Sequence, residues 1–442
     1  MAKGKNIESR NVQITDEVCR PLYGRTSKSW FLGFSFGIVG ILFGVYGIYC
    51  TLFKGIGTWG LDRTIGWGWA ITNFVWWIGI GHAGTFISAI LLLFRQKWRT
   101  GINRAAETMT IFAIICASIF PIIHMGRIAF AFYTIPYPNT RNLWVNFNSP
   151  LLWDVFAILT YFIVSLIFWY IGMIPDLAVL REGKARKFKR KIYSLLSLGW
   201  QGTIFDWKRY DKIMILLASI ATPLVISVHS IVSMDFATSI IPGWHSTIFP
   251  PYFVAGAIFS GFAMVQTLMI ITRKVLNLER HITVKHINSM NKIILLMGSI
   301  VAFAYFIEIF FAFFSGNEFE EFMFLNRATG PYAIWFWIMM FCNIIIPQFL
   351  WFKKIRTNIA VTFVFSILIN FGMWLERFTI VTTSLHRDFM PSNWTIYKPT
   401  FVEVSLFIGS IGLFITLYLV FLRLFPIISF SEIKHQNLEN EE

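Results

Sequence analysis

The feature that most constrains this chain is an apolar run of about 20 residues that recurs from one end of the sequence to the other. A helix of that length crosses a hydrocarbon core ~30 Å thick, so each run is long enough to span a membrane. The runs cover approximately residues 29–53, 65–94, 106–133, 153–178, 211–235, 250–272, 290–314, 332–352, 359–384 and 401–425. The sequence therefore predicts an all-α polytopic membrane protein with about ten transmembrane helices.

Composition, the N-terminal segment and the cysteine spacing further restrict the kind of protein that this chain can be. Only 14% of the 442 residues are charged and 56% are apolar, whereas an ordinary soluble domain carries roughly 25% charged residues. The first 28 residues are polar and contain no short apolar core before a small-residue cleavage site, so we expect no cleavable signal peptide. The four cysteines lack the CxxC or CxxCH spacing of zinc, iron–sulfur or c-type haem sites. They are Cys19, Cys50, Cys116 and Cys342.

The basic residues are distributed very unevenly between the two sides of the predicted membrane. Of 38 lysines and arginines, 30 fall on the side that carries both termini and six on the other. Cytoplasmic loops of membrane proteins carry such an excess of basic residues, so we predict that both termini are cytoplasmic. We interpret the net charge of +15 as a consequence of this membrane topology rather than as a sign of nucleic-acid binding. The basic connection 181–208 also contains apolar residues, which suits either an interfacial helix on anionic lipid or a solvated loop.

These features predict four segments along the chain. Residues 1–28 form a cytoplasmic tail, and residues 426–442 form a second one. Residues 29–235 hold spans one to five, including a first four-helix bundle, and residues 236–425 hold spans six to ten, including a second. Two further helices complete the predicted ten.

Ionisable side chains inside the predicted spans are the candidates for function, because burying an unpaired charge is costly. They are His82, His124, Arg127, Asp154, His229, Asp235, Glu308, Glu376 and Arg377. The predicted topology places most of them in the outer half of the membrane. His124 and Arg127 lie one helical turn apart near the outer end of the third span, on one face. Asp154 opens the fourth span and Asp235 closes the fifth.

A histidine and carboxylates at one depth suit a two-electron, two-proton carrier such as a quinol. Each quinol hydroxyl needs an acceptor that takes its proton as the electron leaves, and a nearby arginine would keep the acids ionised. Structural roles stay open: Asp154 and Asp235 could cap helix ends, and a glycine-flanked His82 suits an interhelical hydrogen bond. His229 could have either a structural or a functional role.

We expect no redox centre within this chain itself. The histidines offer no pair at matched depth for a bis-histidine haem, so electrons would have to pass to a partner.

Glu376 and Arg377 point about 100° apart on a helix and need not pair with each other. Glu107, Asp176 and Asp211 near the inner face could line a proton entry path, although solvation at helix ends is the simpler interpretation.

Several long motifs resemble one known family. The segments FPIIHMGR, NFNSPLLWD, ISVHSIVSMDF and MWLERF are similar to motifs of the NrfD-like (polysulfide reductase membrane subunit) family, over residues 30–430. Within that family the sequence most resembles the C subunits of bacterial alternative complex III, a quinol:electron-acceptor oxidoreductase. The resemblance implies a quinol site near the outer face. Its residues would be His124 in PIIHMGR, Asp154 after SPLLW, Asp235 in HSIVSMDF and Arg377 in WLERF, with Arg127 as a further contact.

The resemblance also implies cofactors, partners and location. The cofactor would be menaquinone or ubiquinone, with iron–sulfur clusters and haem carried by partner subunits rather than by this chain. Those partners would be a periplasmic iron–sulfur subunit, multihaem c-type cytochrome subunits, a paralogous NrfD-like membrane subunit and a terminal oxidase. The chain would lie in the bacterial cytoplasmic membrane, release protons on the outer side, and not be active alone.

Other functions stay open from the sequence. The chain could be the paralogous F-type subunit, acting in proton conduction or as a structural anchor. A transporter with an outward-facing polar pocket and a haem-b membrane anchor are the remaining alternatives.

Overall fold

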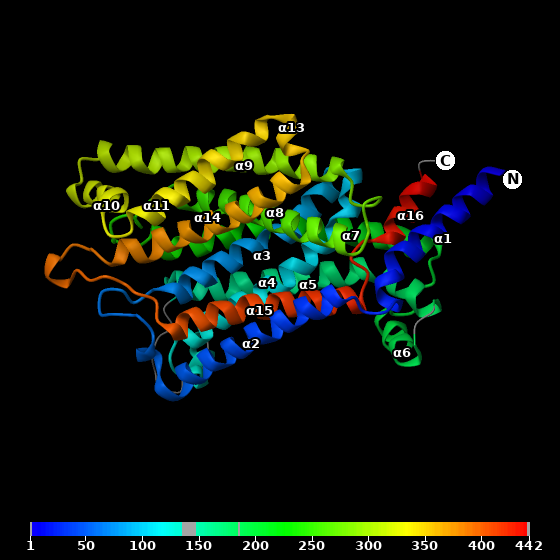
Figure 1. The fold of residues 1–442 in the computed structure, drawn as a ribbon, viewed down its shortest axis with the longest axis horizontal. Helices are drawn as coiled ribbons and strands as arrows, with labels where there is room; N and C mark the ends of the chain where they lie inside the picture. Colours follow the sequence, from blue (N-terminus) through cyan, green and yellow to red (C-terminus); the bar gives the residue numbers. More distant parts are fainter. Residues whose placement is uncertain (1, 135–146, 184–185, 440–442) are drawn as a thin grey trace.

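A computed structural model describes residues 2–134, 147–183 and 186–439 (Figure 1). Most of the predicted outer loop that precedes Ser149, and the acidic end of the C-terminal tail, lie outside these residues. The described chain contains helices and turns and no strand. Its helices that are long and apolar enough to cross a membrane number ten, which confirms the predicted all-α polytopic fold. They are α2 (Lys28–Lys54), α3 (Trp69–Leu93), α4 (Asn103–His124), α5 (Pro150–Glu182), α7 (Ile204–Ala237), α8 (Phe249–Val275), α9 (Val284–Phe314), a composite span (Ala333–Trp351), α14 (Ile359–Leu385) and α15 (Phe401–Leu424).

The composite span is interrupted near its middle. It consists of α11 (Ala333–Met340), a π-helical turn η4 (Phe341–Ile345), α12 (Ile346–Gln348) and the 3₁₀ turn η5 (Phe349–Trp351). Pro347 has no N–H to donate to the carbonyl four residues earlier, and such a gap favours a widened turn. The turn buries Asn343, whose Nδ2 donates a hydrogen bond to the Tyr305 hydroxyl at 2.9 Å.

The spans pack as two neighbouring groups with a flanking pair. In the first group α3 packs on α4 and α7, and α5 packs on the same two helices. In the second, α8 contacts α9 and α14, and α14 contacts α11. Helices α8 and α14 also pack on α3, which joins the two groups, and α2 and α15 lie side by side along the first (Figure 1).

Glycines allow α2 and α15 to approach closely. A Cβ added to Gly44 would lie 2.9 Å from the Cα of Gly409, and one added to Gly40 would lie 2.8 Å from the Cα of Gly412. Backbones that meet this closely need residues without side chains at the crossing. The other faces of α2 stay largely exposed, as expected for a helix at the edge of a membrane protein.

The two ends of the molecule differ in structure. One end, here called the termini end, carries both termini together with α1 (Ala2–Tyr23), α6 (Lys187–Leu196) and α16 (Phe430–Glu439) (Figure 1). The opposite end, here called the loop end, carries η1 (Ile56–Thr58), η3 (Ile128–Thr134) and α10 (Glu318–Thr329). The remaining short elements are η2 (Lys97–Gly101), α13 (Lys353–Arg356) and η6 (Pro391–Asn393).

Both predicted tails form helices that pack on the protein. Helix α1 buries Ile14, Val18 and Leu22, and α16 buries Phe430. Within the predicted basic connection, α6 exposes Phe188 and Leu195 at 75% and 76%. An exposed apolar face beside basic residues suits a helix lying at the membrane surface.

The third predicted span is wrong over its last nine residues. Helix α4 ends at His124, and Gly126 takes a φ of +71°, a left-handed conformation that ends the helix. Residues 128–134 form the separate turn η3. The apolar run continued past the helix because η3 is itself apolar, so hydropathy could not mark the boundary.

Candidate functional site

Two aspartates meet at the loop end. Asp154 lies in the first turns of α5 and Asp235 in the last turn of α7, and these two helices pack together. Their carboxyl groups interact and lie within hydrogen-bonding reach of each other. Each also has a buried Oδ1 atom for which no hydrogen-bond partner is found among the described residues. Two neighbouring carboxyl groups that each keep a buried acceptor oxygen can receive hydroxyl donors from a ligand.

His124 lies at the same end of the molecule. It ends α4, its ring centroid is 5.7 Å from that of Trp59, and its buried Nδ1 has no hydrogen-bond partner within the described ranges. The turn η3 contacts the ends of both α4 and α5. His124 and the aspartate pair therefore lie at one end of the first helix group, and their role as a ligand site stays a prediction.

The two predicted arginines are placed differently from the aspartates. Arg127 lies beyond the end of α4, so the expectation that it shares a helical face with His124 is wrong. Arg377 lies in α14, with Nη1 3.3 Å from Glu376 Oε1 and its guanidinium 4.0 Å from the ring centre of Phe253. The contacts of Arg377 thus join it to the second helix group.

Glu376 is the centre of a polar cluster that the sequence did not predict. The Tyr252 and Tyr305 hydroxyls both donate to its carboxylate, Tyr305 at 3.1 Å. With Arg377 beside it, this carboxylate is paired and hydrogen-bonded, which is how a buried charge is tolerated. Although the two residues point about 100° apart on the helix, their side chains bend toward each other and meet, so the expectation that they need not pair is corrected. The sequence signal that could have indicated this cluster was a tyrosine in each of two neighbouring spans, Tyr252 and Tyr305, at the depth of Glu376.

Two histidines meet in the middle of the first helix group. His82 and His229 are both fully buried, and their Nδ1 atoms lie 2.5 Å apart. The sequence interpretation that the histidines form no pair at matched depth is wrong here. The contact requires one ring to donate and the other to accept, and it leaves no room for a metal ion between those two atoms. The Tyr161 ring packs edge-on against His82, with centroids 4.6 Å apart.

Buried ion pairs occupy the termini end. Arg104 Nη2 lies 2.9 Å from Asp176 Oδ2, and Arg99 Nη2 lies 2.8 Å from Glu432 Oε2, with all four side chains at most 7% exposed. Glu107 is buried as well and accepts a hydrogen bond from Ser88.

The interpretation of Asp176 and Glu107 as solvated helix ends is therefore wrong. Helix α16 packs over Asp176, where Ser431 donates its backbone N–H to Asp176 Oδ1 at 2.9 Å. Asp211 is exposed, as predicted.

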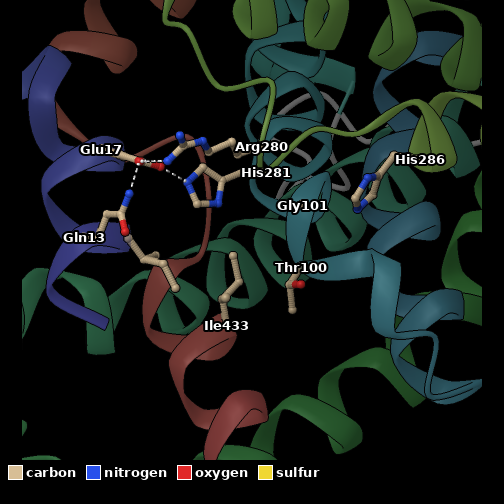
Figure 2. Close-up of a pocket in the computed structure, with 9 residues that line it drawn as sticks. Gln13, Glu17, Thr100, Gly101, Arg280, His281, His286 and Ile433 are labelled. Carbon is tan, nitrogen blue, oxygen red and sulfur yellow. Dashed lines mark hydrogen bonds and ion pairs between the residues drawn. The ribbon is translucent and has the colours of Figure 1, made fainter. Parts of the chain in front are cut away.

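A polar pocket of about 390 Å³ lies between α1, η2 and the α8–α9 connection (Figure 2). Glu17 pairs there with Arg280 and His281, at 3.0 Å each, and accepts a hydrogen bond from Gln13. Burial opposes ionisation of Glu17, but the bonds from Gln13 and His281 outweigh it and hold the pKa of Glu17 below its usual range. His286 lies across the pocket from this group. Because the carboxylate of Glu17 already pairs with Arg280 and His281, these contacts hold α1 in place and do not offer an uncompensated charge to a ligand.

Comparison of the sequence with known proteins identifies the family of this chain. The family model described as "Polysulphide reductase, NrfD" matches residues 59–387. The chain is 23% identical over 395 residues to the membrane C subunit of a putative dimethyl sulfoxide reductase from Halobacterium salinarum, covering 83% of this chain and 85% of that protein. It is 21% identical over 410 residues to the C subunit of a selenate reductase from Mesobacillus selenatarsenatis, covering 89% and 93%. The family predicted from the motifs is therefore confirmed, and the chain belongs to the polysulphide reductase NrfD family.

Proposed function

We propose that this chain is the quinol-binding membrane subunit of a respiratory oxidoreductase complex. The observation that carries the proposal is the Asp154–Asp235 pair at the loop end, with His124 at the same end. Together they offer three buried polar atoms without partners among the described residues. The names of the two relatives, each the C subunit of a reductase, support a role in delivering electrons to a partner.

The residue chemistry supports quinol oxidation. Oxidation of a quinol to a quinone releases two electrons and two protons, so each hydroxyl needs a hydrogen-bond acceptor that can hold its proton. His124 Nδ1 can accept from one hydroxyl, and the free oxygens of the aspartate pair can accept from the other. From these groups the protons leave at the loop end.

The finer assignment is a C subunit of bacterial alternative complex III, which the motifs favour. In that assignment both termini are cytoplasmic, and the loop end faces a periplasmic iron–sulfur subunit. Electrons pass from there to multihaem c-type cytochrome subunits, and a paralogous membrane subunit lies beside this chain. The quinone is menaquinone or ubiquinone. Arg377 then acts on the site through the second helix group rather than by direct contact with the aspartates.

A second candidate role is proton translocation. Buried ionisable groups occur at the loop end, at the His82–His229 contact and at Glu107 near the termini end. Spaced groups of this kind are what a proton relay needs. In proteoliposomes, the Glu107→Gln variant should lose proton uptake while its rate of quinol oxidation stays the same. Unchanged proton uptake would contradict the relay and leave quinol binding as the role of the chain.

The test of the main proposal is quinol turnover by the assembled complex. Asp154→Asn and Asp235→Asn keep the shape of each side chain but remove its capacity to take a proton. Loss of general base catalysis costs about 10²–10⁴-fold, so we expect at least a hundredfold fall in quinol oxidation with normal assembly. The matched control is Asp62→Asn, an exposed carboxyl of the α2–α3 connection. Turnover within threefold of wild type in both variants would refute the assignment.

A further inference from the structure

A large groove at the termini end takes no part in the proposed quinol chemistry. Its volume is about 680 Å³, and its walls come from the α1–α2 link, the start of α2 and the ends of α8 and α15. The Asp154–Asp235 pair lies at the opposite end of the molecule. The groove is therefore a separate feature with its own chemistry.

The mouth of the groove is strongly cationic. Arg20, Arg25 and Arg423 line it, and none of its described lining residues is acidic. This composition differs from the neighbouring polar pocket, where Glu17 neutralises the basic side chains. Arg423 donates to the backbone carbonyls of Pro21 and Gly24, which position its guanidinium without cancelling its charge.

The N-terminus of α2 opens into the same mouth. Ser27 caps this helix, accepting from the backbone N–H of Trp30 at 3.2 Å, and both Ser27 and Ser29 line the groove. The first N–H groups of a helix and its macrodipole favour an anion. The helix terminus and the three arginines thus select the same charge.

The deeper part of the groove is apolar. It runs along α15 from Arg423 to Phe414, nine residues or about 14 Å at the rise of an α-helix, which is about half of a ~30 Å hydrocarbon core. Leu268 and Leu419 line this part, and the Thr272–Tyr418 hydrogen bond lies at its buried side. Ile271, on the wall, is 46% exposed, so the groove is open on its outer side.

We infer that this groove binds one anionic phospholipid, with the phosphate between the arginines and an acyl chain along α15. Guanidinium groups pair with phosphate through two parallel hydrogen bonds, and basic pockets between membrane helices suit anionic headgroups. A quinol fits less well, because the groove offers no carboxylate or imidazole among its described lining residues to take a proton. The bound lipid would join the α1–α2 link and α15 to α8.

The test compares lipid retention by the complete protein in nanodiscs of mixed phosphatidylglycerol and phosphatidylcholine. After extraction, native mass spectrometry counts the lipids retained per chain. We expect wild type to retain one phosphatidylglycerol at least tenfold more often than phosphatidylcholine. The Arg20→Gln/Arg25→Gln variant loses this preference, and the control Arg63→Gln, an exposed arginine at the loop end, keeps it.

A second variant tests the acyl part of the groove with all three arginines intact. Ile271→Trp fills the apolar wall, so it should lower phosphatidylglycerol retention about tenfold. Thermal stabilisation of wild type by phosphatidylglycerol but not by inorganic phosphate at equal concentration supports the lipid over a free anion. Equal retention of the two lipids by wild type, or unchanged preference in the double arginine variant, overturns the inference, as does equal stabilisation by phosphate. Because none of these readouts involves quinol turnover, their failure leaves the proposed function untouched.

Discussion

Replacing Glu432 by glutamine should release the C-terminal helix from the protein. Glu432 Oε2 accepts from Arg99 Nη2 at 2.8 Å and from Asn103 Nδ2 at 3.2 Å, and Oε1 accepts from the Tyr210 hydroxyl at 2.6 Å. The four residues are each buried. In Glu432→Gln the Arg99 charge stays buried without its counter-ion, a change that costs about 3–5 kcal/mol.

A loss of about 3 kcal/mol raises the opening equilibrium of α16 by roughly a hundredfold. Amide hydrogen exchange measures this directly, because local opening sets the exchange rate of the α16 amides. Exchange at residues 430–435 should accelerate by about that factor while α3 is unchanged. The control Glu279→Gln removes an exposed acid from the same end and should have no effect. A change of less than threefold in α16 exchange would contradict the role of the Arg99–Glu432 pair. So would a double variant, Arg99→Met/Glu432→Leu, that removes both charges and still destabilises α16 as much as the single variant.

Three further predictions concern the crossing of α2 and α15, the pH dependence of α16 and the Arg104–Asp176 pair. Gly44→Ala places a Cβ 2.9 Å from the Gly409 backbone and should cost about 1–3 kcal/mol in thermal stability, whereas Gly33→Ala meets only a movable leucine methyl at 3.2 Å and should cost less. Burial disfavours the Glu432 carboxylate, but Arg99 and Tyr210 outweigh it and hold the pKa of Glu432 below its usual range. The carboxylate therefore stabilises α16 at neutral and mildly acidic pH and loses this effect as pH falls through that low pKa, which proteolysis at graded pH would detect. Arg104→Met leaves a buried aspartate unpaired and should cost about 3–5 kcal/mol in the same thermal assay, and a loss under 1 kcal/mol would contradict the buried pair.

The membrane spans could be predicted from the sequence because their signal is local. Each run of about 20 apolar residues satisfies the length of the hydrocarbon core without reference to any other segment. The ends of the runs were less certain. The end of α4 depended on the left-handed Gly126, which hydropathy does not register.

The candidate site was predicted only in part. His124, Asp154 and Asp235 followed from their depth, since residues at the same end of antiparallel spans lie near one another. The contact between the two aspartates, and the absence of Arg377 from it, depend on how α5, α7 and α14 are rotated about their axes.

What the sequence determined by itself was the membrane class, the number of spans, the family and the residue types available for proton chemistry. What only the tertiary structure decided was pairing: His82 with His229, and Glu432 with Arg99. These partners are separated by 147 and 333 residues along the chain, and no local pattern encodes such a distance. A buried polar group requires a partner. Its identity is fixed by the packing of helices far apart in sequence.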